Sequence, residues 1–303
     1  MIKNSILPSY IALVAAAFLY GFLVFGAKIL SMHGFSLIEI LIYPNLIVAV
    51  LVGIFTKPEY KKFFNTTWKV GILYLISVIS VQFGQYGPLF FGLSVSLTVF
   101  LLYMQPLWTT LISVFFLGEK FKPRDGILIC IMLIGLVFLI SPWEEFKFSA
   151  VGFVLAIIGG MGMAGWVTIN GTFNSKRVKP VTTIFYTNIY QSIPFIMMYP
   201  LFAKFLPSAE ISGINFDRGI EALAFLVIYS IVIYIGASAL FYTAAKKVKN
   251  VHLGLVLLLE PVVATILDVV FLNTVITWNI FVGGALILAA NAYLILMSRA
   301  KNS

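Results

Sequence analysis

Long apolar stretches, separated by short groups of charged residues, prolines or glycines, follow one another along the whole chain. A helix needs roughly 20 apolar residues, at about 1.5 Å rise per residue, to cross a hydrocarbon core of about 30 Å. The pattern predicts ten such helices, over residues 9–30, 37–56, 69–91, 94–117, 125–141, 149–173, 181–204, 221–245, 251–273 and 277–298. Only a few residues join the third range to the fourth and the ninth to the tenth, so each of these pairs is expected to form an antiparallel hairpin.

Composition agrees with a chain that crosses the membrane many times. Hydrophobic residues make up 61% of the 303 positions and charged residues 10%, which exceeds the apolar share of a water-soluble domain. We therefore expect an all-α integral membrane protein in a lipid bilayer. The apolar stretch that follows Lys3 is too long for the core of a signal peptide, and we expect it to be retained as the first helix.

The net charge of +9 does not indicate a nucleic-acid partner, because the basic residues lie in short gaps between apolar stretches and not on a water-soluble face. With the N-terminus placed in the cytoplasm, sixteen of the 20 basic residues fall on the cytoplasmic side. The four on the other side are Lys28, Lys147, Lys204 and Arg218. By the positive-inside rule this asymmetry predicts a multi-pass protein of the inner (plasma) membrane with both termini in the cytoplasm.

Few residues are of the kinds that bind metals or form disulfides. Cys130 is the single cysteine and lies in an apolar stretch, so no disulfide framework and no CxxC motif is present. The two histidines, His33 and His252, are expected at helix ends in contact with solvent. No metal and no cofactor is predicted. No two glycines have GxxxG spacing, so no dimer seam is indicated and a monomer is predicted.

An internal repeat divides the chain. The stretch LLYMQPLWTTLISVFFLGEK (101–120) aligns without gaps on VLLLEPVVATILDVVFLNTV (256–275), a shift of 155 residues that places Gln105 on Glu260 and Pro106 on Pro261. The uncharged turn GLSVS in the first half corresponds to the basic turn KKVKN in the second. Five is an odd number, so a second set of five helices enters the membrane upside down, and equivalent loops face opposite compartments.

The repeat predicts one membrane domain built from two inverted five-helix repeats (5+5), residues 1–147 and 148–303. Inverted repeats occur in many secondary transporters, whose substrate sites lie near the bilayer midplane between the two halves.

Three motifs, in this order along the chain, resemble those of the drug/metabolite transporter superfamily and its EamA branch: Tyr20-Gly21 followed by Lys28, Pro106 followed by Gly118-Glu119-Lys120, and Glu260-Pro261. The resemblance covers nearly the whole chain. It departs from the family where Tyr20 replaces a tryptophan and where Tyr43-Pro44-Asn45 stands in place of a frequent arginine. The resemblance implies ten helices with both termini inside, a central cavity lined by both repeats, and export or uptake of metabolites, often amino acids.

Ionisable groups inside a span cost roughly 3 kcal/mol on insertion scales, so they need a partner, water or a proton. Glu260 lies about ten residues into its helix, near the midplane. It could be a protonatable coupling site or a site for a substrate amine, or it could pair with a neighbouring helix or with backbone groups freed by Pro261. Asp268 lies about 12 Å farther along the axis and could form an ion pair with Lys28, for which Glu39 is a competing partner.

Further polar and aromatic residues are expected around a central cavity. Gln105 is equivalent to Glu260 in the repeat and is expected to face it across the pseudo-two-fold axis. The other candidates for substrate binding or coupling are Tyr103, Gln82, Tyr86, Trp166, Asn170, Asn188, Tyr234 and Trp108, with Gln85, Gln191 and Ser238 as additional polar groups. Most of them could instead form interhelical hydrogen bonds. Aromatic walls suit ligands with an apolar or cationic part.

Prolines and glycines mark places where helices bend or approach closely. Pro88, Pro106, Pro194 and Pro261 are expected to kink four helices. Gly84 and Gly87, and the run GGMGMAG at 159–165, are expected to allow close backbone approach, either as hinges or as tight packing.

These features predict a secondary active transporter that moves a small polar metabolite, an amino acid or a related compound, across the inner membrane by alternating access, with a proton-coupled or an exchange cycle. The alternatives are an integral-membrane enzyme and a channel. An enzyme would need clustered acid, base or nucleophilic groups, whereas the two histidines lie far apart and no ATP-binding loop is present. A channel would need a ring of like groups around a pore, and the sequence contains no such filter.

Overall fold

The computed structural model describes residues 6–58, 68–120, 122–143, 148–174, 177–215, 217–272 and 277–300, and within these ranges it contains helices and no strand. A helix or a broken helix lies over every range predicted from the apolar pattern. The unbroken ones are α1 (Leu7–Met32), α2 (Leu37–Phe55), α4 (Trp68–Phe90), α7 (Pro123–Ile140), α10 (Pro180–Phe205) and α16 (Trp278–Ala300). The all-helical fold expected from the sequence is therefore confirmed.

Two helices are interrupted at equivalent places. The fourth range is divided into α5 (Val95–Tyr103) and α6 (Gln105–Leu117), and the ninth into α14 (Asn250–Leu257) and α15 (Leu259–Leu272). Each break lies two or three residues before a proline, Pro106 or Pro261, because proline has no N–H and its ring clashes with the preceding turn. The predicted distortion at these two prolines is confirmed, whereas Pro88 and Pro194 lie inside continuous helices.

The remaining helices contain wider turns. The eighth range consists of α12 (Ile220–Tyr229), a π-helical segment η2 (Ser230–Ala237) and α13 (Ser238–Ala245). A second π-helical segment, η1 (Asn170–Asn174), continues α8 (Ala150–Ile169), and the short helix α11 (Ala209–Ser212) precedes α12. Such π-helical turns often occur at functional sites.

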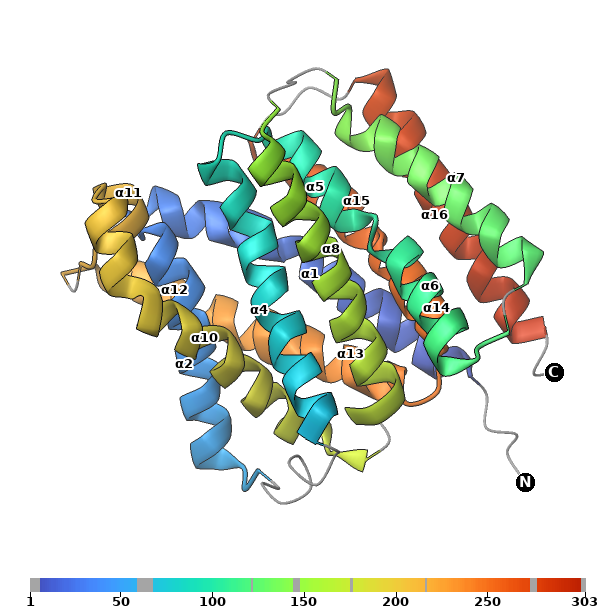
Figure 1. Cartoon of the computed structure of the whole chain (residues 1–303), viewed down its shortest axis with the longest axis horizontal. Helices are drawn as coiled ribbons and strands as arrows, with labels where there is room; N and C mark the ends of the chain where they lie inside the picture. Colours follow the sequence, from blue (N-terminus) through green and yellow to red (C-terminus); the bar gives the residue numbers. More distant parts are fainter. Residues whose placement is uncertain are drawn as a thin grey trace.

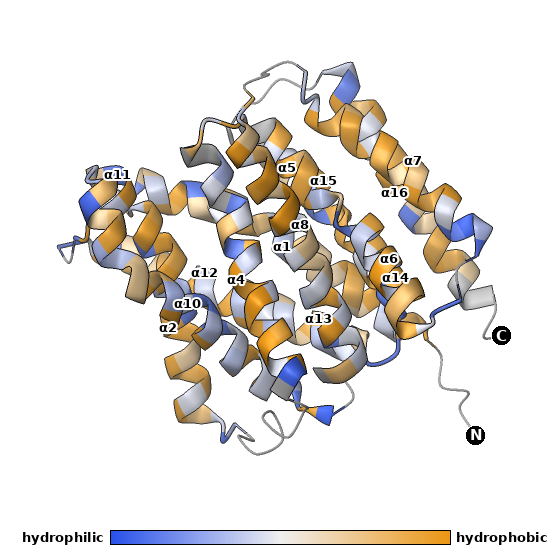
Figure 2. Cartoon of the chain, viewed as in Figure 1, coloured by the Kyte–Doolittle hydropathy of each residue, from blue (hydrophilic) through white to orange (hydrophobic). Residues whose placement is uncertain are grey.

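In the described part of the chain, eight stretches are long and apolar enough to cross a membrane by length and composition. Lys69–Gln85, within α4, is apolar but shorter. α10 is 26 residues long but carries many polar residues and is not one of the eight. The chain is thus a multi-pass membrane protein, while the number of ten spans stays a prediction. Figure 2 shows apolar residues along the helices, with hydrophilic residues concentrated near their ends and in the loops.

Helices from the two halves of the sequence pack against each other (Figure 1). α2 lies along α10, α7 lies along α16 at one edge of the molecule, and α4 lies along α8. α1 packs against α13 and α15, and α8 also packs against α5 and α6. If the ten predicted ranges are numbered, exchanging the first five with the last five turns each of these contacts either into itself or into another member of the same set. The contact of α4 with α8, for example, becomes that of α13 with α1.

Glycines permit the closest of these contacts. A Cβ atom added to Gly84 of α4 would lie 2.2 Å from the Cα of Gly159 in α8, and one added to Gly160 would lie 2.7 Å from the backbone oxygen of Leu101. In the equivalent contact of α1 with α15, a Cβ on Gly21 would lie 2.5 Å from the Cβ of Val263. The predicted close approach at Gly84 and the glycine run is confirmed.

Candidate substrate-binding cavity

A cavity of about 440 Å³ lies between helices of both halves of the chain. Its wall is formed by α1, α4, α5, α7, α8, α10, α14 and α15, together with the broken helix that contains η2 and α13. The volume is in the range of small-molecule sites, which are usually concave and mostly apolar with a few convergent polar groups.

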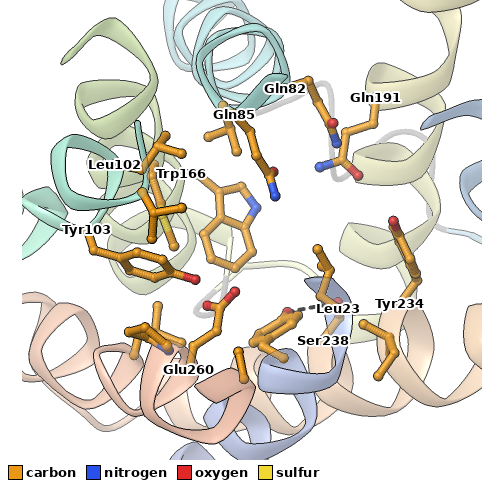
Figure 3. A pocket seen from close by; sticks show the side chains of 18 of the residues that line it. Leu23, Gln82, Gln85, Leu102, Tyr103, Trp166, Gln191, Tyr234, Ser238 and Glu260 are labelled. Carbon is orange, nitrogen blue, oxygen red and sulfur yellow. Dashed lines mark hydrogen bonds between the residues drawn. The ribbon is translucent and has the colours of Figure 1, made fainter. Parts of the chain in front are cut away.

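The structure brings six of the predicted site residues together in this wall. They are Gln82, Tyr103, Trp166, Asn188, Tyr234 and Glu260, and the additional polar candidates Gln85, Gln191 and Ser238 lie there as well. All of these except Asn188 are labelled in Figure 3. Their arrangement around one cavity fits a binding site, although their role in binding stays a prediction.

Glu260 lies in the first turn of α15 and is 8% exposed. The helix is interrupted at Leu258, so this turn is a helix N-terminus inside the protein. Helix N-termini stabilise nearby negative charge. The hydroxyl group of Tyr103 points toward the carboxylate (Figure 3). Pro261 therefore has a structural consequence for the site: the interruption that precedes it places the carboxylate at the start of a new helix.

Aromatic side chains form the wall beside Glu260. The indole ring of Trp166 stacks on Phe241 with a centroid distance of 4.6 Å and an interplanar angle of 15°. Its other close ring neighbours include Tyr20, at 6.5 Å in an edge-on arrangement. The hydroxyl groups of Tyr20 and Ser238 form a hydrogen bond of 3.0 Å between α1 and α13. These contacts fix the orientation of the aromatic rings that face the cavity.

Amide side chains gather on the α4 and α10 side of the cavity. Gln82 and Gln191 lie near one another, and Gln85 extends toward Trp166 (Figure 3). Asn188 donates a hydrogen bond to the backbone oxygen of Ile184 at 2.7 Å, while its side-chain oxygen has no partner among the described residues. This side of the cavity thus offers both donors and acceptors.

Three predicted site residues, Gln105, Asn170 and Trp108, do not line the cavity in the described structure. Gln105 is 1% exposed and donates a hydrogen bond of 2.5 Å to the hydroxyl group of Thr109, so the expected opposition of Gln105 and Glu260 across the cavity is not observed. Asn170 is buried in η1 and donates a hydrogen bond to the backbone oxygen of Trp166 at 2.9 Å. Trp108 lies in α6, away from the cavity wall. The side chain of Tyr86 lies outside the described residues.

The expected partners of Lys28 need a correction. Glu39 was a competing partner for Lys28, but its carboxylate pairs with Arg218 instead. It also accepts hydrogen bonds from the backbone N–H groups of Ser36 at 2.8 Å and of Asn215 at 3.0 Å. Lys28 is exposed. The proposed ion pair of Lys28 with Asp268 falls on a side chain outside the described residues.

The expectation for His252 was wrong, because this side chain is buried and 7% exposed. It forms a hydrogen bond with the hydroxyl group of Tyr10, and its Nε2 atom lies 3.9 Å from Asp125. α14 starts at Asn250, so His252 is already inside a helix that α1 and α7 cover. His33 is exposed, as expected.

Several residues of the cavity wall were not predicted from the sequence as site residues. Tyr20 was noted only as part of a motif, and Thr187 and Tyr242 were not proposed at all. The hydroxyl groups of Thr187 and Tyr242 are 3.2 Å apart, and Tyr74 also forms a hydrogen bond with Thr187. No local pattern distinguishes these residues from others in apolar helices, and only the packing of α10 against α4 and α13 brings them together.

An all-helical, multi-pass membrane fold that encloses a polar cavity is an architecture found among membrane transporters. The model of the EamA-like transporter family matches the chain twice, over residues 7–141 and 150–296. The chain therefore belongs to the EamA-like transporter family of the drug/metabolite transporter superfamily, and the resemblance stated from its motifs is confirmed.

Two further proteins are similar to this chain. An "uncharacterized transporter" of Archaeoglobus fulgidus is 25% identical over 198 residues, which are 64% of this chain and 65% of that relative. The match thus spans somewhat less than two thirds of the relative's length. A protein of known crystal structure superimposes with a TM-score of 0.75 over 95% of this chain and 98% of that chain, at 18% identity. At that identity the likeness shows a shared fold.

Proposed function

We propose that this protein is a secondary active transporter that moves a small polar metabolite across the inner membrane by alternating access. The observation that carries the proposal is the central cavity, which contains one buried carboxylate, Glu260, within a wall of aromatic and amide side chains. A membrane protein keeps an ionisable group at such a place at considerable cost, which favours a role in binding substrate or a coupling ion.

The packing of the helices supports the proposed architecture of ten spans in two inverted five-helix repeats, residues 1–147 and 148–303. When the first five predicted helices are interchanged with the last five, the set of helix contacts described above stays the same. The family model also matches each half of the chain once. A cavity between two such repeats can open to either side when one repeat rocks against the other. In this account both termini are cytoplasmic, as the distribution of basic residues predicts.

The proposed substrates are amino acids or related metabolites, moved by a proton-coupled or an exchange cycle. Glu260 is the group that we assign to coupling, either through a proton or through the charge of the substrate. The family and the archaeal relative are both named as transporters, which favours transport over an integral-membrane enzyme. The wall carries one carboxylate and no ring of like charges among the described residues, which disfavours a channel filter.

Flux measurements in proteoliposomes test this proposal. Purified protein would be reconstituted and supplied with a labelled metabolite extract, and the labelled compounds retained in the vesicles would be identified. Wild-type protein should accumulate one class of metabolite, and Glu260→Gln should abolish or uncouple that flux while the protein stays folded. The matched control Glu221→Gln changes an exposed carboxylate and should transport normally. Wild-type flux with unchanged pH dependence in Glu260→Gln would reject the assigned role.

A further inference from the structure

The cavity has two chemically different sides. One side carries the carboxylate of Glu260 with the aromatic rings of Tyr103 and Trp166, and the other carries the amides of Gln82 and Gln191 (Figure 3). Tyr20 also lines the cavity and contacts the ring of Trp166. A ligand that fills both sides must itself have two parts. The chemistry of each part follows from the groups that would contact it.

The acidic side favours a cation. Glu260 is the carboxylate of the wall, and no Lys, Arg or His is among the described residues that line the cavity. The hydroxyl group of Tyr103 points toward the carboxylate (Figure 3), but no basic side chain lies beside it among the described residues of this wall. An organic cation bound here would supply the missing opposite charge and would contact the indole ring of Trp166, as cations do on aromatic faces.

The amide side favours a planar group with hydrogen-bond donors and acceptors. Gln82 is only 7% exposed, and within the described chain neither its amide nor those of Gln85 and Gln191 form a hydrogen bond with another protein group. A buried amide without a partner costs free energy. Each amide offers a donor and an acceptor side by side, which matches a carboxamide or the edge of a heterocyclic base.

A carboxylate on the ligand would fit poorly. Only neutral donors of the amides and hydroxyl groups could contact it, and Glu260 would repel it across a cavity of about 440 Å³. Desolvation of a charge is expensive unless an opposite charge accompanies it. The cavity is therefore expected to bind cations that lack a free carboxylate in preference to zwitterionic amino acids.

We infer that the ligand of this cavity is an organic monocation without a free carboxylate, whose positive part contacts Glu260 and Trp166 and whose planar hydrogen-bonding part contacts the glutamine amides. The inference rests on the proposed transport function. Within the proposed substrates it selects related metabolites that are cationic and have no free carboxylate, and it disfavours zwitterionic amino acids.

Four related probes test separately whether binding requires the positive charge and whether it requires the planar hydrogen-bonding group. 1-Methylnicotinamide carries a permanent positive charge and a carboxamide, nicotinamide lacks the charge, 1-methylpyridinium lacks the carboxamide, and 1-methylnicotinate replaces the carboxamide by a carboxylate. Their binding to the full-length protein in nanodiscs would be measured by calorimetry and by tryptophan fluorescence. We expect 1-methylnicotinamide to bind more tightly than each other probe, by about tenfold or more, since loss of one good polar partner is worth roughly this factor.

Two variants test which residues contact the positive part of the ligand and which contact its carboxamide. Glu260→Gln should remove the preference for 1-methylnicotinamide over nicotinamide, and Gln191→Leu should remove its preference over 1-methylpyridinium. The matched control Gln105→Leu changes a glutamine outside the cavity and should keep both preferences. If an uncharged or a carboxylate probe binds as tightly as 1-methylnicotinamide, or if none of the four binds, the inference is wrong. Flux of some other metabolite in proteoliposomes would then leave the transport proposal standing, whereas absence of any flux would reject that proposal separately.

Discussion

The carboxylate of Glu39 and the guanidinium group of Arg218 form an ion pair in which the two side chains are 0% and 5% exposed. Arg218 also donates hydrogen bonds to the backbone oxygens of His33 at 3.2 Å and of Asn215 at 3.1 Å. Its guanidinium carbon lies 3.9 Å from the ring centroid of Phe35. The pair therefore fixes the turn between α1 and α2 to the segment that precedes α12, across 179 positions of the sequence.

Replacing one partner of this pair should destabilise the protein. Arg218→Met leaves the Glu39 carboxylate buried without its opposite charge, a change that typically costs about 3–5 kcal/mol. We expect a clearly lower melting temperature in detergent. The control Lys204→Met removes an exposed positive charge and should change the melting temperature little. Equal melting temperatures for both variants would show that the pair contributes no net stability.

The crossing of α4 and α8 provides a second test of packing. Gly84→Ala would place a methyl group 2.2 Å from the Cα of Gly159, so the helices would have to separate. Overpacking of this kind typically costs about 1–3 kcal/mol of stability. We expect Gly84→Ala to lie at the upper end of this range, because the added methyl group meets backbone atoms and not the end of a flexible side chain. The control Gly87→Ala meets only the end of the Leu155 side chain, at 3.4 Å. Thermal unfolding should separate the two variants, and similar stability of both would contradict the observed crossing.

The helices of this fold could be predicted because lipid imposes a simple length and polarity pattern. The same pattern does not specify which helices touch. Glu39 illustrates the limit: Lys28 lies closer in the sequence, but the carboxylate pairs with Arg218, far along the chain. Burial of His252 was missed for a similar reason, since it depends on how α1 and α7 cover the start of α14.

The candidate site was predictable where a polar residue interrupts an apolar stretch. Glu260, Gln82 and Asn188 were proposed on that basis, and all three line the cavity. The assumption of strict symmetry failed for Gln105, which turns to Thr109 and lies against α14 at Gly254. Equivalent positions in two repeats need not have equivalent surroundings.

The hydroxyl group of Tyr103 offers a test of the surroundings of Glu260. Tyr103→Phe keeps the ring but removes the hydroxyl group that points toward the carboxylate (Figure 3), and hydrogen bonds to charged groups contribute roughly 1.5–3 kcal/mol. We therefore expect transport at low substrate concentration to fall by about tenfold or more, with little change in melting temperature. Tyr293→Phe, which alters an exposed tyrosine of α16, is the control. Unchanged transport in Tyr103→Phe would show that this contact does not matter for the cycle.

The proposed orientation predicts which loops are accessible from each side. In a Cys130→Ser background, a cysteine at exposed Lys57 should react with a membrane-impermeant maleimide only from the cytoplasmic side. A cysteine at exposed Asp217 should react only from the opposite side. The positive-inside distribution is the reason for both expectations. Labelling of the two positions from the same side would contradict the proposed topology, and reversed labelling would invert it.

Alternating access to the cavity is the central claim, and a single cysteine in its wall tests it most directly. Ala264 lines the cavity on α15, one turn beyond Glu260, and Ala264→Cys would be introduced with Cys130→Ser and reconstituted in proteoliposomes. An impermeant thiol reagent should block flux when applied from either side, transported substrate should slow the reaction, and the cysteine-free protein should be unaffected. Reaction from one side only, or from neither, with flux intact, would contradict a cavity that opens alternately to the two sides of the membrane.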